Sequence, residues 1–214
     1  MQLNTSKLRT AGRLRGHGRR GNAIVELGLL AMPMTVLLMG TVVIGLNLGR
    51  SIQAAQVNRD AGSMFVRGID FTAQFNRNIL IRLGQGLGLA DTGGRGVVYF
   101  SKVTWISQAK CNLYVRDGND DAGCNANQHV IVQRVVIGDP SQRTSTLGTP
   151  ASNLIDAKGL VANYVTKSSA IAYFPWMQLA DNEYAYVAET YFDSPDFDLP
   201  GFQNNTGVYN ISVY

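Results

Sequence analysis

Histidine and cysteine are scarce in this chain, which has 2 of each among its 214 residues. His17 lies in a basic N-terminal segment, so His129 is the only histidine in the rest of the chain. His129, Cys111 and Cys124 supply three ligands, one fewer than a structural zinc site requires. No dinucleotide or phosphate motif is present, because the glycine-rich residues 84–90 follow no strand pattern and lack the last glycine. We therefore expect no enzymatic activity and no cofactor.

Acidic residues are absent from the first 21 positions, which carry six lysines and arginines. Without those six, the chain has 13 Lys and Arg against 15 Asp and Glu. That balance is not typical of a basic nucleic-acid-binding surface, so we predict no nucleic-acid partner. We interpret residues 1–21 as a basic cytoplasmic leader, a targeting segment separate from the folded protein.

Charge is almost absent from residues 23–48, where Glu26 is the only ionisable side chain. About 20 helical residues cross the hydrocarbon core of a bilayer, whereas the apolar stretch of a cleaved secretory signal has about 7–15. Basic residues before a span keep the preceding terminus in the cytoplasm. The sequence therefore predicts a transmembrane helix over residues 22–49, a cytoplasmic N-terminus and a body on the far side of the membrane.

Glu26 requires an explanation, because a carboxylate in a membrane span costs roughly 2.5–3.5 kcal/mol on insertion scales. If the chain were cut between Gly21 and Asn22, the new α-amine of Asn22 would be a cation near the membrane. An ammonium and a carboxylate in low dielectric attract strongly, and each relieves the desolvation of the other. The Glu26 of a neighbouring subunit fits this role better than the residue's own chain, so the pair would also set the register between subunits.

Residues 19–62 carry a family resemblance. The basic leader, Gly21, the NAIVE segment and the long apolar run are similar to the class III signal of type IV pilins, and more narrowly to the TadE-like pseudopilins of the tight-adherence (Tad/Flp) pathway. One departure is Leu27, where these pseudopilins commonly have an aromatic residue. The resemblance implies that a prepilin peptidase cuts between Gly21 and Asn22 and that Glu26 sets the register in assembly.

The same resemblance implies a location and partners. The protein would cross the inner membrane once, with its C-terminal domain in the periplasm, and would reach the cell surface if assembled into a pilus. Its partners would be the prepilin peptidase, other pilin or pseudopilin subunits and inner-membrane platform proteins. The pilus would serve adhesion or secretion.

The hydrophobic patterning predicts an α+β fold, pilin-like in layout. A helical stalk over residues 50–83 follows the span, with Ile52, Ala55, Val57 and Phe65 at loose helical spacing before Gly68 and a second helix over residues 71–83. Pro33 is expected to kink the first helix. Residues 84–214 form a β-rich domain with antiparallel strands over residues 97–106, 129–137, 184–192 and 207–214. Residues 84–96 form a loop, and residues 160–165 a short helix.

The two cysteines, Cys111 and Cys124, enclose twelve residues. In a translocated domain such a pair is expected to form a disulfide, which contributes about 3 kcal/mol for a loop of this length. Within that loop Asp117, Asn119 and Asp121 match the first three ligand positions of a calcium loop, but Ala122 and Gln128 break the pattern. They form a weak calcium candidate and no metal site is predicted.

Two alternatives to a pilin-like protein remain at this stage. Asp91 begins an Asp-Thr-Gly triplet like that of aspartic proteases, but the triplet occurs once and in a glycine-rich loop. A membrane-anchored protease would depend on Asp91. A signal-anchored periplasmic binding module would not be processed at Gly21 and would tolerate loss of the Glu26 carboxylate.

Overall fold

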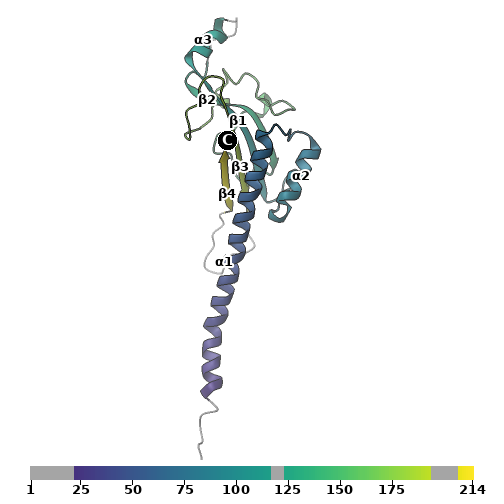
Figure 1. The fold of residues 1–214 in the computed structure, drawn as a ribbon, viewed down its shortest axis with the longest axis vertical. Coiled ribbons are helices and arrows are strands. Elements are labelled where there is room, and N and C mark those ends of the chain that lie inside the picture. The colour runs from purple at the N-terminus through teal and green to yellow at the C-terminus, as the bar shows by residue number, and fades with distance from the viewer. Residues whose placement is uncertain (1–21, 117–122, 194–206) are drawn as a thin grey trace, which may run out of the picture. The chain divides into compact units, whose positions relative to one another are not determined.

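The computed structural model describes residues 22–116, 123–193 and 207–214. The chain divides into two compact units, Met1–Ile44 and Gly45–Tyr214, and the second unit contains every strand that the structure describes. Figure 1 shows the elements in chain order. They are α1 (Asn22–Val66), α2 (Gln74–Gly84), η1 (Gln85–Leu87), β1 (Gly96–Ile106), α3 (Gln108–Arg116), β2 (Gln128–Gly138), η2 (Ser152–Leu154), η3 (Ser168–Ala170), β3 (Tyr184–Phe192) and β4 (Val208–Val213).

Helix α1 is 45 residues long and begins at Asn22. The prediction of one helix that continues past the apolar run towards Gly68 is confirmed. Pro33 lies inside the helix, and a kink there stays a prediction. After Val66, Gly68 adopts a φ of 82° and the N–H of Ile69 donates to the carbonyl of Met64 at 3.1 Å. A glycine in the left-handed region satisfies the last helical carbonyls and ends the helix.

The second half of α1 packs on the sheet through one face. Ala54, Val57, Ala61 and Phe65 are all buried, at intervals of three, four and four residues. The sequence prediction counted Ile52 on this face, but Ile52 is 52% exposed. Two of the four buried residues are alanines, which a count of large apolar residues does not detect.

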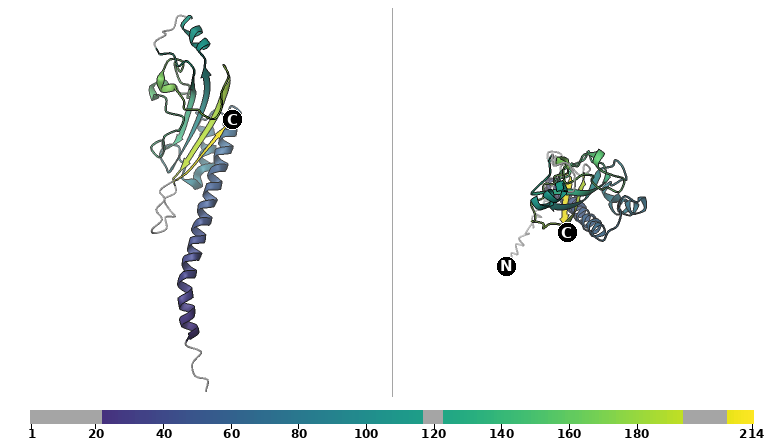
Figure 2. Two further views of the ribbon diagram at one scale, coloured as in Figure 1. Left: turned by 90° about the vertical axis from the view of Figure 1, so that its left-hand side faces the viewer. Right: turned by 90° about the horizontal axis from the view of Figure 1, so that it is seen from above.

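The four strands form one antiparallel sheet in the order β2-β1-β3-β4. All four were predicted within one residue at each end, because each is rich in valine, isoleucine and aromatic residues. Strands β1 and β2 shift register between Lys102 and Val103, where Lys102 pairs with Gln133 and Val103 with Ile131. Figure 2 shows the strands beside the later part of α1.

The sheet separates two apolar clusters within the second unit. On one face, Phe100, Ala188 and Phe192 pack with Leu80 of α2 and with the buried face of α1. On the other face, Ile131 and Val187 contribute to a cluster with residues of the long segment between β2 and β3. This segment contains Leu147, Val161, Ala170, Ala172 and Phe174.

Segment 159–172 was predicted in part as a helix, and that prediction is wrong. Its backbone instead pairs with the outer edge of β2 near both ends: the N–H of Arg134 donates to Gly159, that of Val161 to Val132, and that of Ala172 to His129, at 2.7–3.0 Å. Between these contacts, residues 162–166 form turns and Ser168–Ala170 is η3. The pairing satisfies backbone groups at an otherwise open strand edge. Helix α3, which carries Cys111, was not predicted.

Helix α2 begins at Gln74, three residues later than predicted. It packs through Leu80 and Gly84, while Phe71 is buried in the turn before it. The predicted apolar residues Phe75, Ile79 and Leu83 are exposed.

Candidate functional site

The apolar run of α1 carries its large side chains in exposed positions. From Ile24 to Leu48 these side chains, other than Val43, are 46–76% exposed. Among the described helices, α1 alone is long and apolar enough to cross a membrane. An apolar surface of this extent is not stable in water and marks a site that a membrane or other protein chains cover.

Glu26 lies in this run, one turn into α1, and its side chain is exposed. Within residues 22–116, 123–193 and 207–214 no cation contacts its carboxylate, and no hydrogen bond to the side chain is present. Gly21 lies outside the described residues, and of Asn22 the structure describes the backbone at the start of α1. The described chain therefore offers Glu26 no charge partner of its own.

Cys111 and Cys124 lie at disulfide distance and are bonded, with 6.1 Å between their Cα atoms. The predicted pairing of the two cysteines is confirmed, and the bond ties α3 to the segment before β2. The weak calcium candidate of Asp117, Asn119 and Asp121 falls outside the described residues. In the part of the chain that the structure does describe, no group of three or more His, Cys, Asp or Glu side chains could hold a metal ion.

Asp91 is an anchor for α2 in this structure. The Nε of Arg77 donates to its Oδ1 at 2.6 Å, and Gln74 lies 3.4 Å from its Oδ2. Its backbone carbonyl accepts a bond from the N–H of Gly138 at the end of β2. These contacts give the Asp-Thr-Gly triplet a structural role that joins α2 to the sheet.

His129 lies on β2 between two aromatic rings, with Trp105 at 4.8 Å and Phe174 at 5.1 Å between ring centroids. The residue is buried, and its Nε2 has no hydrogen-bond partner among the described residues. Burial lowers the pKa of His129 from its ordinary value, because it disfavours the charged imidazolium. His129 is thus a neutral core residue of the sheet.

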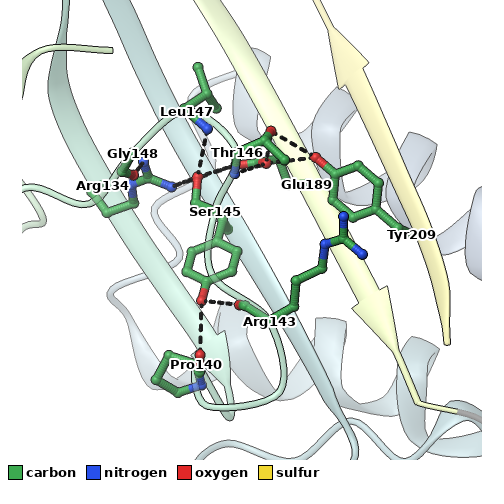
Figure 3. Close-up of polar contacts among 10 residues, drawn as sticks. Arg134, Pro140, Arg143, Ser145, Thr146, Leu147, Gly148, Glu189 and Tyr209 are labelled. Carbon is green, nitrogen blue, oxygen red and sulfur yellow. Dashed lines mark hydrogen bonds and ion pairs between the residues drawn. The ribbon is translucent and has the colours of Figure 1, made fainter. Parts of the chain in front are cut away.

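A buried charged pair is the main polar feature that the sequence reasoning missed. Arg134 on β2 and Glu189 on β3 are 3% and 1% exposed, and the guanidinium Nη1 lies 3.7 Å from the carboxylate Oε2. Figure 3 shows how a loop between β2 and β3 reaches into this pair. Nη1 of Arg134 donates to the hydroxyl of Ser145 at 2.8 Å, and that hydroxyl donates to Glu189. Nη2 donates to the carbonyl of Gly148 at 2.6 Å.

The second carboxylate oxygen of Glu189 accepts three further bonds. The donors are the N–H of Thr146 at 2.8 Å, its hydroxyl at 2.6 Å, and the hydroxyl of Tyr209 on β4 at 2.7 Å. Arg143 lies over the ring of Tyr209, with its Cζ 4.2 Å from the centroid. One carboxylate therefore joins the loop, β3 and β4.

Burial governs the titration of this network. It lowers the pKa of Arg134 to about 10, although the Glu189 carboxylate acts in the opposite direction. Burial also raises the pKa of Tyr209, and its bond to Glu189 adds to the effect. At neutral pH the guanidinium is charged and the phenol is neutral, so the network is a fixed structural support. In the sequence, the buried pair is indicated by one charged residue in each of two strands that otherwise carry no charge.

Comparison with protein-family models, with curated proteins and with solved structures finds no match for this chain.

Proposed function

We propose that this protein is a non-enzymatic, membrane-anchored minor pilin or pseudopilin of the TadE-like kind. A prepilin peptidase cuts it between Gly21 and Asn22, and the apolar half of α1 then anchors the mature chain in the inner membrane. The mature protein assembles with related subunits and inner-membrane platform proteins in the biogenesis of a Tad/Flp-type pilus used for adhesion or secretion.

The observation that carries this proposal is the exposed apolar run of α1 with Glu26 as its one charge. An anchor that only tethers a domain needs no carboxylate, and a carboxylate without a partner is costly in a membrane. Cleavage before Asn22 would supply an α-amine on every subunit. Pairing of that amine with the Glu26 of a neighbour would hold subunits in one register, because both charges lie in low dielectric.

The body of the protein supports an assembly role as well. The second half of α1 belongs to the same compact unit as the sheet and packs on it through Ala54, Val57, Ala61 and Phe65. The buried charges of Arg134 and Glu189 are used in internal contacts, and Asp91 is bound by Arg77. These side chains act as supports of a rigid subunit.

The direct test is the N-terminal sequence of the full-length protein, purified from membranes of cells with and without a prepilin peptidase. We expect a chain that begins at Asn22 only when the peptidase is present. Gly21→Val should block cleavage, because a side chain at this position interferes with close approach to the backbone. Gly28→Ala is the matched control, since a Cβ at Gly28 meets nothing within 4 Å.

An intact leader in both strains would overturn the proposal and favour a signal-anchored periplasmic binding module. Cleavage at another position would also contradict it, because Glu26 would then stand at a different distance from the new amine.

A further inference from the structure

Beyond the end of α1, the sheet carries a groove of about 360 Å³. Its apolar walls come from Phe65, Ile69, Leu160 and Tyr186, and its polar groups include Lys102, Gln133 and Lys158. Ligand sites commonly have this size and combine an apolar surface with a few convergent polar groups. The whole groove belongs to the second compact unit.

A cross-strand row forms the floor of this groove. Lys102 on β1 pairs with Gln133 on β2 and with Tyr186 on β3. The register of β1 and β2 shifts directly after Lys102, and β-bulges are over-represented next to functional sites because they re-aim side chains. The ring of Phe65 meets Tyr186 edge to face at 5.5 Å and closes the apolar wall.

The ammonium of Lys102 is held in place by aromatic rings. Its Nζ lies 4.0 Å from the ring centroid of Tyr184 and 5.3 Å from that of Tyr186. Among the described residues no carboxylate forms an ion pair with it. Cation–π contacts of this kind contribute about 0.5–1 kcal/mol at exposed sites and leave the positive charge uncompensated.

Lys158 adds a second positive charge on a well-defined turn. Oδ1 of Asp156 accepts the N–H groups of Lys158 and Leu160, both at 2.8 Å, and Gln133 donates to the carbonyl of Lys158 at 3.2 Å. The acid of the lining is Asp70, whose carboxylate accepts both the N–H and the hydroxyl of Thr72, at 2.8 and 2.6 Å. Those bonds lower the pKa of Asp70, and the positive charge of Lys158 adds to the effect.

We propose that this groove binds an acidic peptide segment of a partner protein, with a carboxylate side chain at Lys102 and Lys158 and an apolar neighbour against Phe65 and Tyr186. Charge complementarity selects the carboxylate, because two lysines and one acid, Asp70, give the lining a net positive charge, and no described carboxylate forms an ion pair with Lys102. This inference does not depend on cleavage at Gly21.

The test uses the full chain in lipid nanodiscs and a fluorescently labelled peptide of alternating leucine and glutamate, with binding followed by anisotropy. We expect saturable binding that weakens with added salt, as a charge-dependent contact at a surface does. The same peptide with glutamine in place of glutamate should bind at least about tenfold more weakly, which corresponds to ~1.4 kcal/mol.

Lys102→Gln should weaken binding of the glutamate peptide by a similar factor. Lys167→Gln is the matched control, because it removes the same charge from an exposed lysine that does not line the groove. Equal binding of the glutamate and glutamine peptides would overturn the proposal, as would equal losses in the two lysine variants. Hexanoate that competes at the same concentration as the peptide would assign the groove to a small free carboxylate instead.

Discussion

Glu26 and Glu189 present the same problem in two regions of the molecule. Each is a single carboxylate within an apolar stretch, Glu26 in helix α1 and Glu189 in strand β3. Glu189 is 1% exposed and accepts four hydrogen bonds, from Ser145, twice from Thr146, and from Tyr209. Glu26 is exposed and has no such donor among the described residues.

Glu26 and Glu189 therefore differ in where the partner of each charge lies. A buried carboxylate is tolerated only when hydrogen bonds and a counter-charge replace water. The fold itself supplies them for Glu189. For Glu26 the described chain supplies none, and this is why we propose that its partner belongs to another subunit.

The largest effect is expected at Glu189. Glu189→Leu would leave Arg134 buried without its counter-charge, and breaking a buried pair in this way costs about 3–5 kcal/mol. Thermal unfolding of the full chain in detergent, followed by circular dichroism, should show a strongly lowered midpoint. Glu183→Gln is the control, because it removes an exposed carboxylate. Equal midpoints for the two variants would contradict the role we assign to the network.

A double variant sharpens this prediction. Arg134→Met combined with Glu189→Leu removes both charges, and replacing a buried pair with apolar residues of similar volume is often close to neutral. We expect the double variant to recover a large part of the stability lost in Glu189→Leu. Additive losses would instead show that the two residues act independently.

A smaller effect on stability, but a large one on assembly, is expected at Glu26. Glu26→Leu should change the free energy of unfolding by less than about 0.5 kcal/mol, because the side chain has no partner in the described chain. In cells that contain the peptidase, loss of the pair with the α-amine should weaken association between subunits by ~1.4 kcal/mol. Cross-linking between subunits should then fall on the order of tenfold.

Two controls separate assembly from processing in that experiment. The N-terminal sequence of Glu26→Leu must still begin at Asn22, and Thr35→Val removes a polar group from the same helix without removing a charge. Undiminished cross-linking in correctly processed Glu26→Leu would show that the glutamate is not a register device.

The smallest expected effect concerns His129. Its folded-state pKa is lowered below the ordinary value of 6.5 by burial. Between the folded-state pKa and 6.5, the unfolded chain binds more protons than the folded one. The contribution of neutral His129 to the stability is therefore fully present above pH 6.5 and is lost as the pH decreases. The unfolding midpoint of the wild type should therefore drop more between pH 7.5 and pH 5 than that of His129→Gln. Parallel pH profiles would contradict this.

Much of the fold could be predicted, because local patterns determine it. The strands were located by β-branched and aromatic residues, and the helix from Asn22 by its uninterrupted apolar run. The disulfide followed from two cysteines in a short segment. On the face of α1 after Arg50, Val57 and Phe65 were predicted correctly and Ile52 was not, and Ala54 and Ala61 were missed because alanine is not strongly hydrophobic.

The buried pair and the groove could not be predicted, because their members are far apart in the chain. Arg134 and Glu189 are 55 positions apart, and Phe65, Lys102 and Lys158 come from three separate segments. A lone charge in an apolar strand signals a buried polar contact, but only the strand order β2-β1-β3-β4 decides which charges meet.

Local sequence patterns were sufficient for the elements that depend on neighbouring residues: the apolar helix with its single glutamate and the four strands. Hydrophobic periodicity and charge are local properties, so they can be read along the chain. Tertiary contacts alone satisfy Glu189 internally, pair residues 159–161 and 172 with the edge of β2, and hold Lys102 beside Tyr184 and Tyr186 at an open groove. These contacts depend on strand pairing and on the path of long connections, which bring together residues that no local pattern relates.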